Sequence, residues 1–202
     1  LHIFLSDCSK EGVVLLNLIE TFSSEVERTS GRTALLPVGS LEQHGTEAPL
    51  GCDAIIAEAI CRRAGQLSST FVLPTLFYGY SLCHTSFPGT FSLSEKTYTA
   101  LLGEIVSEAA RNKFSRVLIL SGHGGNRKSA EKAISKTSEQ IRTKYLGYWE
   151  LPGVAEKETS LCGKSGYHIT TSEVSMVWYL LSEEIPGSFR GIYPPSVENI
   201  ST

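Results

Sequence analysis

The chain has 202 residues, of which 41% are hydrophobic, and a net charge of −3. This length suits one domain with a full core, so we expect a single domain over residues 1–202. Acidic and basic residues are scattered, which argues against a nucleic-acid-binding protein. The five cysteines are irregularly spaced and form no C-x-x-C pair, which disfavours a disulfide framework or a cysteine-built zinc site and fits a reducing compartment. The longest apolar run is too short to span a membrane and no signal peptide is recognised, so a soluble cytoplasmic protein is expected.

Segments of helical and strand-like pattern alternate along the chain. In the first half of the chain, the patterns predict an amphipathic helix within Val13–Phe22, a buried strand at Thr33–Val38, a helix at Ala54–Leu67 with Asp53 as its N-cap, a strand at Phe71–Leu76 and a long loop at Phe77–Ser92. In the second half, they predict a helix at Ser94–Lys113 preceded by a Ser92/Glu95 capping box, a strand at Arg116–Leu120, a helix at Lys128–Arg142, a strand at Tyr145–Trp149 and a helix at Glu173–Leu181. This alternation predicts an α/β fold, with a mostly parallel β-sheet flanked by helices. In such sheets, sites form in the loops after the carboxyl ends of the strands.

The first polar motif follows the strand at Thr33–Val38. It reads GSLEQHG and contains Glu42 and His44, and Asp53 comes shortly after it. Glutamate, histidine and aspartate are ligands that zinc and related metals accept. In an extended loop, Glu42 and His44 can face the same side because they are two residues apart. Taken singly, each of these residues is equally well explained as an ordinary loop residue or a helix cap.

The second motif, SGHGGN, directly follows the strand at Arg116–Leu120 and contains His123. Its glycines allow the backbone to approach a ligand closely. The alternatives are a tight turn in which the histidine is incidental, and a phosphate-binding turn. The phosphate-binding alternative fails because neither G-x-G-x-x-G nor a Lys-Ser/Thr pair is present.

Two further histidines lie in polar segments. His168 could act as a general acid or base and Glu173 as another ligand, although Thr170 and Glu173 also match a capping box. Cys83 and His84 raise the possibility of a thiolate nucleophile. Neighbouring residues of an extended segment point in opposite directions, so that pair is geometrically awkward.

Together these segments resemble the creatininase (creatinine amidohydrolase) family, in its GHGGN branch. The resemblance covers the chain from about Leu35 to about Leu181 and rests on pieces that come in the family's order and spacing: LPVGSLEQHGTEAPLGCDAIIAEAI (Leu36–Ile60), HTSFPGTFSL (His84–Leu93), SGHGGN (Ser121–Asn126) and YHITTSEV (Tyr167–Val174).

The resemblance implies a centre of two divalent metal ions, with zinc expected first and manganese or iron as alternatives. Carried over by motif, Glu42 and His123 would bind one ion and His44 the other, with Asp53 between them. Glu173 matches the family's E-T-S glutamate and would complete the second site.

The resemblance also assigns residues outside the metal centre. His168 would protonate the leaving nitrogen. The residues expected to contact or orient the substrate are Gly124, Gly125, Asn126 and Tyr167. A homohexamer is implied by the resemblance alone.

The implied reaction is hydrolysis of a C–N bond in a creatinine-like cyclic amide or a related small amide by a metal-activated hydroxide. Two departures from creatininases proper bear on the substrate. Gly125 stands where they carry a glutamate ligand, and Tyr167 stands where a glutamate precedes the histidine. The alternatives are therefore a formamide hydrolase, a peptide-trimming peptidase of the same family, or a non-catalytic binding homologue.

Overall fold

The computed structural model describes residues 16–26, 32–163 and 166–182. Five strands form one sheet in the order β1-β3-β2-β4-β5, and every neighbouring pair is parallel. The strands are β1 (Leu16–Asn17), β2 (Thr33–Val38), β3 (Phe71–Val72), β4 (Arg116–Ser121) and β5 (Arg142–Gly147). The helices are α2 (Ser23–Val26), α3 (Cys52–Ser68), α4 (Glu95–Arg111), α5 (Arg127–Thr137), α6 (Val154–Cys162) and α7 (Thr171–Ser182), with short 3₁₀ turns η2 (Leu82–His84), η3 (Gly124–Asn126) and η4 (Tyr148–Glu150). The predicted α/β class with a parallel sheet is confirmed.

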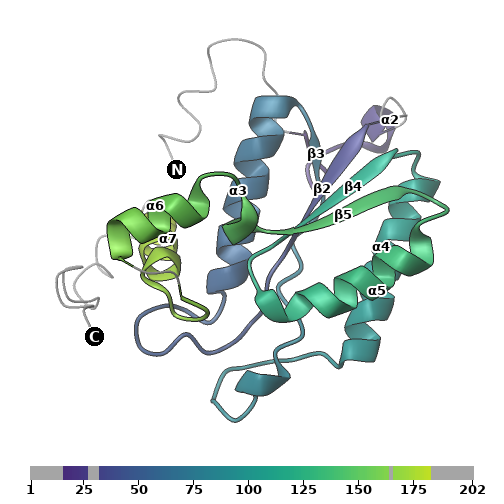
Figure 1. Cartoon of the computed structure of the whole chain (residues 1–202). Helices are drawn as coiled ribbons and strands as arrows, with labels where there is room; N and C mark the ends of the chain where they lie inside the picture. The colour runs from purple at the N-terminus through teal and green to yellow at the C-terminus, as the bar shows by residue number, and fades with distance from the viewer. Residues whose placement is uncertain (1–15, 27–31, 164–165, 183–202) are drawn as a thin grey trace.

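Helices cover both faces of the sheet. Helices α3, α6 and α7 lie on one side, and α4 and α5 lie on the other (Figure 1). Strand β2 shows why: Leu36 is buried with the α4 side, whereas its neighbour Leu35 is buried with the α3 and α7 side. Successive side chains of a strand point to opposite faces, so a central strand that is apolar throughout requires a helical layer on each side.

Two elements, β1 and β3, differ from the prediction. The predicted helix in Val13–Phe22 is wrong at Leu16–Asn17, which pair with β3 as a strand, and its first residues lie outside the described part. A short apolar run fits both periodicities, so pattern alone cannot decide. Strand β3 is only two residues long, and Pro74, which has no N–H to donate, follows it after one residue.

Helix boundaries also differ from the prediction. Helix α4 is capped by Ser94, whose hydroxyl accepts from the Thr97 N–H at 3.1 Å, and not by the predicted Ser92/Glu95 box. Helix α5 ends at Thr137, three exposed polar residues follow it, and Arg142 already belongs to β5. The predicted strand at Tyr145–Trp149 ends at Gly147, and α6 was not predicted.

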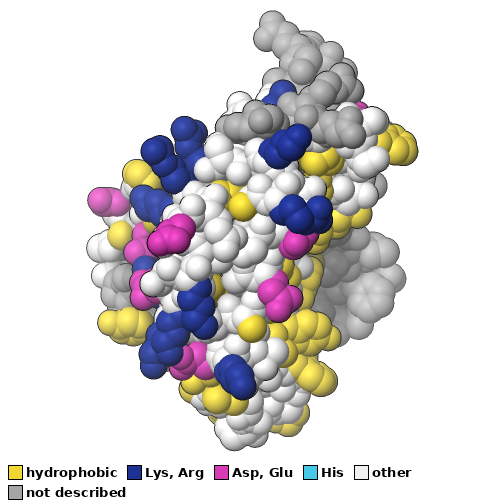
Figure 2. Space-filling model, turned by 90° about the vertical axis from the view of Figure 1, so that its right-hand side faces the viewer, with side chains coloured by type: hydrophobic (Ala, Val, Ile, Leu, Met, Phe, Trp, Pro, Cys, Tyr) yellow, Lys and Arg dark blue, Asp and Glu magenta, His cyan; other side chains and the backbone are white. Residues whose placement is uncertain are grey.

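Charged side chains of both signs share one face of the molecule. The face shown in Figure 2 carries basic and acidic side chains interspersed, without a patch of one sign. Ion pairs on α4 and α5 join Lys132 to Glu95 and Arg127 to Glu150. Within the described residues, no helix has both the length and the apolar character needed to cross a membrane.

The carboxyl ends of β2 and β4 place the two polar motifs side by side. Val38 and Ser121 are paired in register, so the loops that begin at the next residues start next to each other. The first turn of α3 packs directly on this edge. A Cβ at Gly122 would lie 2.0 Å from the backbone oxygen of Asp53, so only glycine permits this approach.

We expect Gly122→Ala to lower the free energy of unfolding by about 1–3 kcal/mol, because the added methyl would push α3 away from β4. Chemical denaturation measures the change. Gly103→Ala is the matched control: it lies within α4, where an added Cβ would meet no atom within 4 Å, and should stabilise by about 0.5–1 kcal/mol. An unchanged stability for Gly122→Ala would contradict the close packing.

Candidate metal centre

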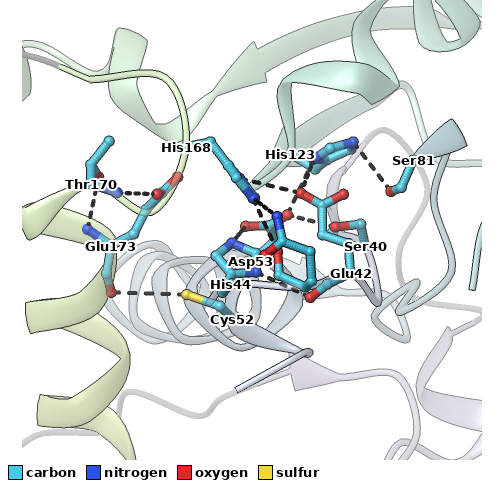
Figure 3. A network of polar contacts seen from close by, with 12 residues as sticks. Ser40, Glu42, His44, Cys52, Asp53, Ser81, His123, His168, Thr170 and Glu173 are labelled. Carbon is cyan, nitrogen blue, oxygen red and sulfur yellow. Dashed lines mark hydrogen bonds and ion pairs between the residues drawn. The ribbon is translucent and has the colours of Figure 1, made fainter. Parts of the chain in front are cut away.

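Five polar side chains converge at the carboxyl edge of the sheet (Figure 3). Glu42 and His44 follow β2, Asp53 lies in the first turn of α3, His123 follows β4, and His168 lies just before α7. Four of them are buried, and the His168 side chain is a quarter exposed. The parallel topology explains the convergence, since the loops after neighbouring strands open on the same edge.

Asp53 lies between two histidines. Its Oδ1 is 3.1 Å from His44 Nε2, and its Oδ2 is 3.2 Å from His123 Nδ1. The Ser40 hydroxyl donates to Oδ2 at 2.6 Å. The sequence prediction that Asp53 caps α3 is wrong, because Gly51 occupies the N-cap position and no side chain caps there. Each oxygen of this carboxylate faces a different histidine, as would suit a ligand shared by two ions.

Glu42 lacks the aligned hydrogen bonds that usually accompany a buried carboxylate. It is fully buried, and neither carboxylate oxygen has an aligned hydrogen bond from a described residue. Its Oε1 makes a 3.2 Å ion-pair contact with His123 Nδ1. A buried carboxylate without hydrogen bonds is costly, and a bound cation would lower that cost.

The spacing between these polar atoms also fits a cation. Two ligand atoms about 2.0–2.1 Å from a tetrahedral zinc ion lie about 3.3 Å apart. The contacts of Asp53 and Glu42 with His44 and His123 measure 3.1–3.2 Å. The residues present therefore fit a divalent metal ion.

Backbone carbonyl groups orient both of these histidines. His44 Nδ1 lies 3.2 Å from the Glu42 carbonyl oxygen, and His123 Nε2 lies 3.0 Å from the Tyr80 carbonyl oxygen. An N–H that donates to a carbonyl leaves the lone pair of the other ring nitrogen facing the carboxylates. This outer-sphere contact is typical of histidines that bind metals.

Charge coupling in the metal-free centre is strong. Burial alone would raise the pKa of Asp53, but hydrogen bonds from His123 and His44 outweigh it and hold that pKa well below its usual range. Burial would lower the pKa of His123, yet its contacts with Asp53 and Glu42 raise it to about 10. Protonated histidines thus supply the positive charge that the carboxylates require, and a divalent ion would replace those protons.

Among the described residues, three groups bring potential ligand atoms within 4.8 Å of one another. They are Glu42/Asp53/His123, His44/Cys52/Asp53 and Glu42/His44/His168. The first matches one predicted ion, and the second contains the His44–Asp53 pair of the other. Burial raises the pKa of the Cys52 thiol, which disfavours its thiolate as a ligand.

Glu173 lies at the edge of this arrangement. Its Oε2 accepts from the Thr170 N–H at 2.8 Å, and its own N–H donates to Thr170 Oγ1 at 3.1 Å. The alternative of a capping box is therefore confirmed. Glu173 is buried and lines a cavity together with Glu42, Asp53 and His123. Its role as a metal ligand stays a prediction.

A cavity of about 700 Å³ opens above the metal-site residues. Gly124, Gly125 and the fully exposed Tyr167 line it, as expected for residues that contact a substrate. Asn126 does not line it. The Asn126 side chain accepts from the Tyr80 N–H at 3.0 Å and donates to the Gly39 carbonyl at 2.8 Å, so it ties the long loop to the end of β2.

Two residues of this site were not singled out from the sequence. The sequence suggested a role for His84 only as a partner of Cys83, yet its Nε2 lies 3.7 Å from Glu42 Oε1 and its ring stacks on His168 at 4.3 Å. Gln43 contacts both His84 and His168 through its amide. The sequence signal that could have identified His84 as a site residue was its position in a loop that follows a parallel strand.

Comparison with known proteins settles the family. The family model for creatininase, described as creatinine amidohydrolase, matches residues 20–189. This chain belongs to the creatininase family. The resemblance drawn from the sequence motifs is thereby confirmed.

Relatives in this family differ in what they are named for. The chain is 32% identical over 129 residues to the creatinine amidohydrolase of Pseudomonas putida, covering 57% of this chain and 50% of that protein. It is 37% identical over 110 residues to a mycofactocin precursor peptide peptidase of Mycolicibacterium smegmatis, covering 50% and 43%. The chain spans about half the length of the curated relatives it matches.

A solved creatininase shares the fold. The structure described as "Creatininase Mn" superposes with a TM-score of 0.76 at 26% identity, covering 86% of this chain and 76% of that one.

The departure from creatininases at Gly125 has a structural counterpart. A Cβ on Gly125 would lie 2.4 Å from His123 Nε2 and 2.5 Å from the Tyr80 carbonyl oxygen. The contact that orients His123 therefore occupies the space that a side chain at this position would need. Within the described structure, a glutamate ligand at position 125 requires the His123 ring and the Tyr80 backbone to move.

We expect Asp53→Asn to lose both ions, because the predicted centre uses this one carboxylate for both and an amide oxygen carries no charge. Glu42→Gln should lose only the ion next to His123. Elemental analysis of the purified variants measures the metal content per chain, with the exposed Glu131→Gln as the control for a lost charge. Full occupancy in Asp53→Asn would contradict the shared position.

Proposed function

We propose that this protein is a metal-dependent amidohydrolase that cleaves a C–N amide bond with water. The observation that carries the proposal is the fully buried Glu42 carboxylate, whose oxygens have no aligned hydrogen bond from a described residue, beside an Asp53 whose two oxygens face different histidines. The ions would be held by Glu42, Asp53 and His123 on one side and by Asp53 and His44 on the other, with Glu173 as a further candidate. Zinc is the first expectation, and manganese or iron are alternatives that the same donor types accept.

The protein's own side chains supply the rest of the chemistry. A divalent ion in this position provides Lewis acidity and lowers the pKa of a water molecule. In hydrolysis, the water oxygen bonds to the amide carbon, the C–N bond breaks and the leaving nitrogen takes up a proton. His168 faces the centre, with Nδ1 3.6 Å from Glu42 Oε1, and this position supports it as the donor of that proton. The Gly124 and Gly125 backbones line the cavity where the carbonyl oxygen would lie.

The cavity favours a substrate larger than a small cyclic amide. Its volume of about 700 Å³ lies in the range that holds drug-sized ligands, and Tyr148 and Trp149 form part of its wall. This observation supports the second candidate within the family, hydrolysis of a peptide or a comparably large amide. A cytoplasmic homohexamer remains an expectation that comes from the motifs and the family.

A substrate panel tests the proposal. We expect the zinc- or manganese-loaded protein to hydrolyse at least one class among creatinine, formamides and short peptides, with turnover lost after chelation and restored by metal. The cavity favours peptides. Stoichiometric metal without hydrolysis of any class would instead support a non-catalytic binding homologue.

We expect His168→Ala to keep both ions and lose about 10²–10⁴-fold in kcat on an alkyl amide, as removal of a general acid would explain. The loss should be much smaller on an anilide with a strongly electron-withdrawing substituent, because its leaving group needs no proton. Steady-state kinetics on both substrates, with metal content measured in parallel, distinguishes a proton donor from a histidine with a structural role. An equal loss on both substrates would remove His168 from the donor role.

A further inference from the structure

Each of four histidines in the site has one ring nitrogen that faces away from the metal centre, its outer nitrogen, and the contacts of these outer nitrogens differ. The outer nitrogens of His44 and His123 face backbone carbonyl oxygens. Those of His84 and His168 face the side-chain amide of Gln43, whose Nε2 lies 3.4 Å from His84 Nδ1 and 3.0 Å from His168 Nε2. A carbonyl accepts a proton from the ring, whereas an amide NH₂ donates one to it.

The orientation of the Gln43 amide is set by the backbone. The Gly45 N–H donates to Gln43 Oε1 at 3.0 Å. The oxygen end is thereby identified, so the NH₂ end must be the one that faces the two histidines. Gln43 is also held through its own backbone, since its N–H donates to Thr90 Oγ1 at 3.0 Å.

This donor favours one tautomer for each ring. A ring nitrogen that accepts from Gln43 carries no proton, so the neutral ring carries it on the other nitrogen. For His84 that is Nε2, 3.7 Å from Glu42 Oε1, and for His168 it is Nδ1, 3.6 Å from the same oxygen. Both rings would then present an N–H to the metal centre. A protonated nitrogen cannot bind a metal.

The rings also support each other. His84 and His168 stack with centroids 4.3 Å apart and planes 23° apart, and the His44 ring lies 4.7 Å from the His168 ring with their planes tilted by 50°. His168 Nε2 also lies 3.0 Å from the Gln43 carbonyl oxygen, a contact that favours a proton on Nε2. A neutral ring can satisfy only one of these two contacts. The Glu42 carboxylate lies 3.6 Å from Nδ1 and is a stronger acceptor than a neutral carbonyl group, so it favours the tautomer with its proton on Nδ1.

We infer that Gln43 is a positioning residue that holds His84 and His168 as a stacked pair of N–H donors directed at the metal centre. His84 joins His168 in the proposed reaction, so that two donors face the substrate while His44 and His123 bind metal. The inference rests on the proposed function for its catalytic meaning. Its structural content, the tautomer of each ring, is independent of activity.

NMR of protein labelled with ¹⁵N in histidine tests the tautomers directly, in the metal-free and the zinc-loaded protein. The signals of His84 and His168 are assigned from His84→Gln and His168→Gln variants. We expect the Nε2–H tautomer for His84 and the Nδ1–H tautomer for His168 in the zinc-loaded protein. The Nε2–H tautomer at His168, or a zinc-bound nitrogen at either ring, would overturn the inference. This readout stands even if no amide is hydrolysed, so it fails separately from the proposed function.

Variants of Gln43 test the cause. In Gln43→Glu the carboxylate accepts from both rings, so we expect both tautomers to reverse while the two ions remain bound. kcat on an alkyl amide should fall at least tenfold with KM little changed. Gln43→Met has similar length without a donor or charge, and should lose activity without reversing both tautomers.

Gln140→Glu places the same charge change at an exposed position after α5 and should match the unmodified protein. Unchanged histidine tautomers in Gln43→Glu, with the protein folded and metal-loaded, would show that Gln43 does not set them.

Discussion

The carboxylate of Asp53 is the group on which the rest of the site depends. It is buried at the start of α3, and its two oxygens face His44 and His123 from different strand ends. A charged group in this position is tolerable only with positive charge close by. The histidines provide it in the metal-free protein, as the raised pKa of each shows, and two divalent ions would provide it in the loaded protein.

This one group constrains the fold around it. Asp53 reaches the edge of the sheet only because α3 begins against Gly122, where a larger residue would collide with the Asp53 backbone. Strands β2 and β4 lie next to each other in register, so the loops that carry Glu42 and His123 meet at the same point. The long loop after β3 brings His84 to that edge and is tied there by Asn126. The chemistry therefore depends on packing that contains no catalytic group.

The two central strands and the candidate metal ligands were predictable from the sequence, whereas the short strand β1 and the residues around the ligands were not. Strand β2 was predicted at its observed bounds and β4 to within one residue, because buried parallel strands are continuously apolar. Glu42, His44, Asp53 and His123 were identified because recognisable motifs follow those strands.

The misses have physical causes. Leu16–Asn17 is too short to show a period, and the paired residues that make it a strand are distant in the chain. Gln43 and His84 carry no metal-binding signature, and their roles depend on contacts across 125 and 41 positions of sequence. The capping box at Thr170 and Glu173 was visible in the sequence, but whether Glu173 also binds metal depends on geometry that no pattern encodes.

Anomalous diffraction from crystals of the zinc-loaded protein tests the shared carboxylate most directly. The account predicts two peaks that flank Asp53, each about 2.0–2.2 Å from one of its oxygens. One peak should also contact Glu42 and His123, and the other His44. A single peak, or two peaks of which one does not contact Asp53, would contradict the account.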